Sequence, residues 1–202
     1  TGAGGPWQLD RIVSELRAVR AQRRGAQQRT REFGAREFPS RDALRDIAEA
    51  LCGVLFPMRL GPSDLHQESE DFYIGHTLDA ALVSLQQQVR LELHYNARHA
   101  ADCGGDVDVR ARRIVEAFAL SLPELRRLLD TDVLAAYQGD PAARSVDEVL
   151  LCYPGVLAVI HHRLAHKLHS LGVPLVGRII AEAAHSLTGI DIHPGAQIGA
   201  GF

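Results

Sequence analysis

Apolar residues recur every three or four positions through most of this 202-residue chain, and the pattern ends at Thr188-Gly189. That spacing is typical of amphipathic α-helices, each of which must bury one face against a neighbour. It predicts a mainly α-helical chain with an N-terminal helical bundle over residues 7–187. Residues 1–6 carry no such pattern, and we expect them to form a disordered lead-in.

The apolar stripes and their flanking residues predict the first helices. Ser40 is the type of residue that caps a helix N-terminus, so a helix should follow it. A long helix is expected from about residue 67 to 100, and Cys103-Gly104-Gly105 should end it. The stripes of these helices are Trp7, Leu9, Ile12, Val13, Leu16 and Val19; Leu44, Ile47, Ala48, Leu51 and Leu55; and Ile74, Leu78, Ala81, Leu82, Leu85, Val89 and Leu93.

Prolines and glycines divide the second half of the predicted bundle. Pro123 can occupy the first turn of a helix, so we expect it to end one helix and start the next. Pro154-Gly155 and Gly172-Val173-Pro174 are expected to separate further helices. The expected helices of this half lie within residues 109–122, 124–129, 131–137, 155–171 and 175–187.

After residue 188 the period changes from helical spacing to a repeat of six. Ile192 and Ile198 are six apart, as are Ala196 and Phe202, and glycines and a proline lie between them. This glycine content excludes a helix and weakens an ordinary strand. A period of six with inward aliphatic residues is typical of a triangular β-solenoid, which needs several stacked coils to close a core. From two hexads alone, a glycine-rich loop is an equal alternative.

Three motifs in the last third of the chain resemble one protein family. The run Thr-Gly-Ile-Asp-Ile-His-Pro-Gly-Ala-Gln-Ile-Gly over residues 188–199 resembles the start of the hexapeptide-repeat domain of bacterial serine O-acetyltransferases. Residues 155–168, with Arg163-Leu164-Ala165-His166, are similar to the helix that leads into that domain, and Asp140-Pro141-Ala142 is similar to a family motif. The Asp-Ile-His-Pro-Gly-Ala piece occurs across hexapeptide acyltransferases and does not by itself identify serine as acceptor.

The resemblance implies a fold and an activity. The helical bundle would be followed by the first coil of a left-handed parallel β-helix over residues 188–202, where this chain stops. The implied reaction is transfer of the acetyl group from acetyl-CoA to the hydroxyl of L-serine, which gives O-acetylserine for cysteine biosynthesis in the cytoplasm. Alternatives are another hexapeptide-repeat acyltransferase, or a non-catalytic helical oligomerisation module.

The resemblance also implies site residues. Asp140 would bind the substrate ammonium group, and Pro141 would fix the loop that carries it. Without the resemblance, a turn or helix-capping role for Asp140 after Gly139 is the more common interpretation. A serine hydroxyl needs a general base, and the family's Asp-His pair would lie beyond Phe202. We therefore expect no catalytic or acetyl-CoA-binding residue within this chain, no activity from residues 1–202 alone, and for His193 a structural or coil-corner role.

The partners follow from the same resemblance. They are L-serine, acetyl-CoA as co-substrate, other copies of the chain through the helical domain, and O-acetylserine sulfhydrylase through a C-terminal tail absent from these residues. The resemblance implies a hexamer for the full-length protein. We expect no bound cofactor. We expect no nucleic-acid partner because the net charge is −3, and no membrane partner because no apolar run approaches the roughly 20 residues that cross a bilayer.

Three other clusters of residues could carry chemistry. The basic stretch of Arg17, Arg20, Arg23, Arg24 and Arg31 lacks interleaved aromatic residues, so it is interpreted as a solvated helix face. The three cysteines form no C-x-x-C pair, which favours free thiols in a reducing compartment over a zinc site. His162, His166 and His169 lie on one helical face, which could bind a transition metal. No carboxylate lies at ligand spacing, so we expect no metal there. We expect these histidines to face solvent or a subunit interface.

Overall fold

The computed structural model describes residues 7–26, 38–99 and 106–202, and it contains helices and connecting turns but no strand in those ranges. The chain divides into two units, residues 1–36 and 37–202. In the described part of the first unit, residues 7–26, the chain forms the helix α1 (Leu9–Ala26). Its predicted apolar residues are all exposed within this chain, as are Arg17, Arg20 and Arg23. Residues 1–6, Arg31 and Cys103 lie outside the described residues.

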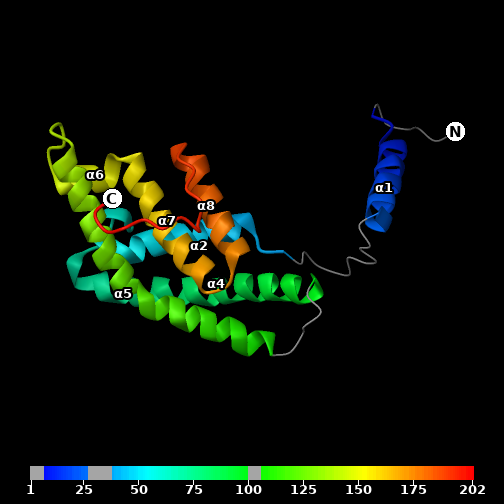
Figure 1. Cartoon of the computed structure of the whole chain (residues 1–202), viewed down its shortest axis with the longest axis horizontal. Coiled ribbons are helices and arrows are strands. Elements are labelled where there is room, and N and C mark those ends of the chain that lie inside the picture. Colours follow the sequence, from blue (N-terminus) through cyan, green and yellow to red (C-terminus); the bar gives the residue numbers. More distant parts are fainter. Residues whose placement is uncertain (1–6, 27–37, 100–105) are drawn as a thin grey trace. The chain divides into compact units, whose positions relative to one another are not determined.

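The second unit is a bundle of two long helical pairs and shorter connecting helices (Figure 1). The helices α4 and α5 pack along one another, and α7 packs along α8. The helix α2 contacts both α4 and α8, while α5 contacts α7. The elements are α2 (Arg41–Leu55), α3 (Pro57–Leu60), η1 (Gln67–Ser69), α4 (Glu70–His99), α5 (Val107–Gly139), α6 (Val146–Cys152), α7 (Pro154–Ser170) and α8 (Pro174–Thr188).

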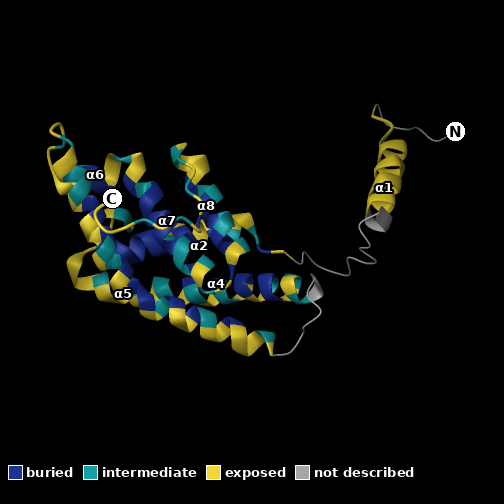
Figure 2. Cartoon of the chain, viewed as in Figure 1, coloured by how far each residue is buried: buried dark blue, intermediate teal, exposed yellow. Residues whose placement is uncertain are grey.

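The core of this unit lies where the predicted stripes meet (Figure 2). The Ser40 hydroxyl accepts the backbone N–H of Ala43 and caps α2, as predicted. Every residue of the predicted α2 stripe is buried, and Leu85 and Val89 of α4 are fully buried against it. Within the described ranges no helix combines the length and the apolar character that a bilayer crossing requires.

The prediction of three helices between residues 109 and 137 is wrong. One continuous helix, α5, runs through Pro123. Pro123 has no N–H for the carbonyl of Ala119, and such a loss costs about 3 kcal/mol in a helix interior. Its ring lies on the exposed side, while Phe118 and Leu122 before it and other apolar residues after it stay buried on the same face. Burial along that face therefore outweighs the missing hydrogen bond.

The last helix ends where the period changes. Gly189 has φ 74°, and its N–H bonds to the carbonyl of His185, which is a left-handed C-cap. Residues 190–202 then form no strand and run as an irregular segment against α7 and α5. A solenoid coil takes its ladder hydrogen bonds from the coils stacked on it, so one coil has no backbone partner. The β-helix start stays a prediction.

Candidate functional site

Asp140 lies in the tight turn that follows α5. Its Oδ1 accepts the N–H of Ala142 at 2.8 Å, and its carbonyl accepts the N–H of Ala143 at 3.1 Å. Pro141 occupies the second position of this turn, where its fixed φ suits the chain reversal. Asp140 is half-buried and Pro141 is exposed.

Tyr153 holds the other oxygen of this carboxylate. Its hydroxyl donates to Oδ2 of Asp140 at 2.6 Å. The hydroxyl of Tyr153 and the N–H of Ala142 lower the pKa of Asp140, and the same bond to Asp140 raises the pKa of Tyr153 to about 12. Asp140 is therefore ionised at neutral pH. An ionised carboxylate offers about four lone-pair sites, so two donors leave capacity for a cation.

The helix α6 brings Tyr153 back to Asp140. The Ser145 hydroxyl accepts the N–H of Glu148, and the Glu148 carboxylate accepts the N–H of Arg144, an arrangement close to a capping box. Pro154 then occupies the first turn of α7, which leaves Tyr153 as the residue between the two helices. Sequence reasoning missed Tyr153. The Ser145-x-x-Glu148 spacing was a signal for the short helix but not for the tyrosine contact.

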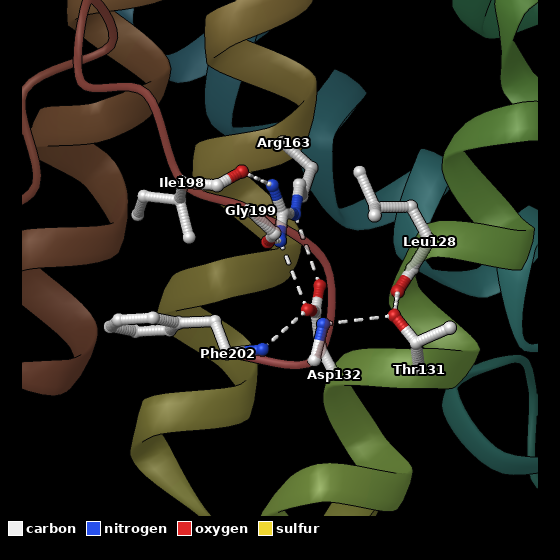
Figure 3. Close-up of polar contacts among 8 residues, drawn as sticks. Leu128, Thr131, Asp132, Arg163, Ile198, Gly199 and Phe202 are labelled. Carbon is white, nitrogen blue, oxygen red and sulfur yellow. Dashed lines mark hydrogen bonds and ion pairs between the residues drawn. The ribbon is translucent and has the colours of Figure 1, made fainter.

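A second polar centre joins α5 to α7 (Figure 3). Arg163 of α7 and Asp132 of α5 form an ion pair whose side chains are only 4% and 3% exposed. Nε and Nη2 of Arg163 donate to the two carboxylate oxygens of Asp132 at 3.0 and 2.9 Å. The pair is bidentate, the strongest geometry for such a contact. The sequence marked Arg163 only as part of a family-like motif, and it contained no sign of Asp132.

The same pair contacts the C-terminal segment, residues 190–202, near its end. Arg163 also donates to the carbonyl oxygens of Ile198 and Gly199, each at 2.6 Å. Asp132 Oδ1 accepts the N–H of Phe202 at 3.0 Å (Figure 3). The helical unit therefore binds the hexapeptide-like segment through buried charges, because a backbone without strand partners needs other donors and acceptors.

The histidines of α7 differ from expectation. His162 is buried within the chain rather than facing solvent or a subunit interface, and the neighbouring His161 is buried as well. His162 Nδ1 has no hydrogen-bond partner among the described residues, and burial, then His166 and Arg163, lower its pKa to about 4. Nδ1 of half-buried His166 lies 2.8 Å from the carbonyl oxygen of Pro194. These rings fill the core and the contact with the C-terminal segment.

His193 makes short-range contacts in the C-terminal segment. Its Nδ1 accepts the N–H of Gly195 at 3.0 Å, and its ring meets the His169 ring edge-on. Among the described residues no group of three histidine, cysteine or acidic side chains is placed to hold a metal ion. Cys52 and Cys152 are free thiols.

Comparisons with known proteins bear on these motifs. No protein-family model matches the chain. A plasmid serine acetyltransferase of Synechococcus elongatus is 45% identical over 199 residues, which is 97% of this chain and 62% of that protein. The serine acetyltransferase of Mycobacterium tuberculosis is 56% identical over 69 residues, which is 34% of this chain and 30% of that protein.

Solved structures agree with the sequence matches. Serine acetyltransferase isoform 3 of Entamoeba histolytica, in complex with cysteine, superposes with a TM-score of 0.64 at 28% identity, over 85% of this chain and 54% of that one. Serine acetyltransferase 1 of the same organism, in complex with L-cysteine, superposes with a TM-score of 0.62 at 32% identity, over 78% of this chain and 52% of that one. This chain thus spans about three fifths of the Synechococcus protein and about half of each Entamoeba chain. By sequence and by fold, this chain is similar to serine acetyltransferases over most of its own length.

Proposed function

We propose that the full-length protein carrying this chain is a serine O-acetyltransferase. It transfers acetyl from acetyl-CoA to the hydroxyl of L-serine and gives O-acetylserine, an intermediate for cysteine. Similarity to serine acetyltransferases over 97% of the chain supports the reaction. The observation that carries the proposal in this chain is the carboxylate of half-buried Asp140, which hydrogen bonds from Tyr153 and Ala142 hold in one orientation.

Asp140 is proposed to bind the ammonium group of serine. A carboxylate that is already oriented by Tyr153 and Ala142 loses little further entropy when a cation arrives. Pro141 limits the motion of the same turn. Cysteine, which two Entamoeba relatives hold, carries the same ammonium and carboxylate as serine. Asp140 would therefore contact either amino acid.

The remaining machinery is proposed to follow this chain. Residues 188–202 would be the first coil of a left-handed β-helix, completed by coils stacked on it. A serine hydroxyl is a weak nucleophile, so an Asp-His pair beyond Phe202 would act as general base and acetyl-CoA would bind on the solenoid. Residues 1–202 alone would then show no acetyl transfer.

The proposed setting is that of a cytoplasmic biosynthetic enzyme. The helical unit would mediate self-association, leading to hexamers in the full-length protein, and O-acetylserine sulfhydrylase would bind a C-terminal tail. Light scattering of the full-length protein tests the assembly, and a hexameric mass is the expected result. A monomer would contradict it.

The reaction is tested by measuring release of free CoA from acetyl-CoA by the full-length protein. L-serine, L-homoserine and no acceptor are compared in parallel. Release that requires L-serine is expected. Release that requires a different hydroxyl acceptor would assign another hexapeptide-repeat acyltransferase, and no release with any acceptor would favour the helical oligomerisation module.

A further inference from the structure

We propose that Arg163 and Asp132 are positioning residues, which fix the distance between Asp140 and the residues that follow Phe202. They would act without touching substrate, by clamping residues 198–202 onto α5 and α7. The inference rests on the proposed function, in which Asp140 binds serine and the catalytic base lies on the solenoid. Its physical basis is a buried ion pair that directs most of its remaining hydrogen bonds to one segment of backbone.

The guanidinium of Arg163 is nearly saturated. A guanidinium has five N–H donors, and four of its hydrogen bonds are formed: two to Asp132 and one each to the carbonyls of Ile198 and Gly199. Because the guanidinium is planar, these acceptors must lie close to one plane around it. The position of residues 198–199 is therefore tied to the orientation of one buried side chain.

Two adjacent residues of α5 hold the end of the same segment. Asp132 Oδ1 accepts the N–H of Phe202 at 3.0 Å, and Thr131 Oγ1 accepts the N–H of Gly201 at 3.1 Å. The Thr131 hydroxyl is itself fixed, because it donates to the carbonyl of Leu128 at 2.7 Å (Figure 3). Four backbone groups of residues 198–202 thus bond to side chains of the helical unit.

Little else holds this segment. Residues 199–202 are all exposed, Phe202 to 66%, and they have no strand partner within the described chain. Apolar burial therefore contributes little to their placement. A buried ion pair is a weak source of net stability, since its desolvation offsets much of the attraction, but its geometry is specific. The pair accounts for where the segment lies.

The clamp is mechanically connected to Asp140. The helix α5 runs unbroken from Asp132 to Gly139, so Asp132 and Asp140 are separated by about two helical turns. Tyr153, at the start of α7, bonds to Asp140, and Arg163 on the same helix bonds to Asp132. The two helices are thus cross-linked at two points, and the proposed ammonium site and the hexapeptide segment share one rigid frame.

The consequence concerns alignment of the two reaction partners. Serine would be held by the helical unit through Asp140, whereas the general base and acetyl-CoA would be held by the solenoid. A displacement of about 1 Å between reacting groups costs up to about 100-fold in rate. Loosening the clamp should therefore impair the use of serine and leave acetyl-CoA binding unchanged.

The test compares Asp132→Asn and Arg163→Lys with wild type in the full-length protein. We expect kcat/KM for serine to fall about 10- to 100-fold in Asp132→Asn, with the KM for acetyl-CoA unchanged. Arg163→Lys keeps the charge but not the planar fork, so an intermediate loss is expected. Asp130→Asn is the matched control, because Asp130 lies on α5 in an exposed ion pair with Arg126, and it should keep wild-type kinetics.

Hydrogen–deuterium exchange on the full-length protein gives a readout that does not depend on activity. Peptides covering residues 196–202 should exchange faster in Asp132→Asn than in wild type or Asp130→Asn. Thr131→Val removes the bond to Gly201 and the bond to the carbonyl of Leu128 but leaves the buried charges intact, so it tests the clamp should Asp132→Asn fail to fold. It should speed exchange in the same peptides.

Two outcomes of the kinetic comparison would overturn the proposal. One is faster exchange at residues 196–202 with unchanged kcat/KM for serine. The other is a fall in kcat that matches the loss of folded enzyme and disappears when rates are expressed per folded protein, which is the signature of a merely structural pair. If wild type shows no serine-dependent CoA release, the proposed function fails, and unchanged exchange in both variants would separately refute the clamp.

Discussion

The carboxylate of Glu92 caps the N-terminus of α8 by accepting the backbone N–H of Val176 at 2.7 Å. Its other oxygen accepts the N–H of Leu175 at 2.9 Å, and the side chain of Glu92 is fully buried. The first N–H groups of a helix have no partner within the helix, and a negative charge there also interacts favourably with the helix dipole. An α4 side chain thus fixes where α8 begins.

Glu92 makes stability depend on pH. Burial raises its pKa above the ordinary value of 4.5, although the N–H groups of Leu175 and Val176 oppose the shift. The folded chain then binds the proton more tightly than the unfolded chain, so this contribution is complete below pH 4.5 and is lost as pH rises through the folded pKa. Urea unfolding should show wild type losing stability relative to Glu92→Gln as the pH rises above 4.5. A constant difference would contradict this.

The buried ion pair should dominate the response to single substitutions. Asp132→Asn leaves the guanidinium of Arg163 buried without a counter-charge, which costs about 3–5 kcal/mol of unfolding free energy. Asp130→Asn breaks an ion pair of the same type whose side chains are 41% and 53% exposed, and such pairs contribute about 0–1 kcal/mol. Chemical denaturation measures both. Equal effects would show that burial of the pair does not matter.

The sequence could predict the stripe of α2 but not the buried contacts of Glu92 and Arg163. The stripe of α2 and its Ser40 cap depend on neighbours within one helix, so periodicity was enough. Glu92 bonds to residues 83 and 84 positions away, and Arg163 to one 31 positions away. A charged residue in a sequence is interpreted as surface, because its burial depends on a distant partner.

Tertiary packing also overruled a correct local rule. Proline disfavours a helix interior, yet Pro123 lies inside α5 because the buried face continues past it. For the candidate site, the Asp140 motif could be identified from the sequence. The bond from Tyr153 could not, since it depends on how α6 turns the chain back over 13 residues.

The bond between Asp140 and Tyr153 can be tested by absorbance at 295 nm. With the Tyr153 pKa at about 12, only about 1% of this phenol ionises at about pH 10. Asp140→Asn weakens the hydrogen bond and removes the charge that together raise this pKa most, while burial still raises it, so the ionised fraction of Tyr153 at that pH should increase. The double variant with Tyr153→Phe should abolish the increase. An unchanged signal in Asp140→Asn would mean that the bond is absent in solution.

His162 should make the fold sensitive to acid. Its pKa falls from 6.5 to about 4 in the folded state, chiefly through burial, so the unfolded chain binds more protons between those values. Its contribution is fully present above pH 6.5 and declines by roughly 3 kcal/mol as the pH falls to about 4. Burial also lowers the pKa of His161, and His161 is kept unchanged in the variant described next. We expect His162→Leu to lose less stability than wild type over this range, measured by urea unfolding at each pH. A parallel loss would contradict the assignment.

Asp140 is proposed to bind serine in an acetyl-CoA-dependent transferase. The most direct measurement is the serine dependence of CoA release by the full-length protein, compared between wild type and Asp140→Asn. A hydrogen bond to a charged group is worth about 1.5–3 kcal/mol, so the KM for serine should rise about 10- to 100-fold while the KM for acetyl-CoA stays the same. The same KM for serine in both proteins would contradict the account.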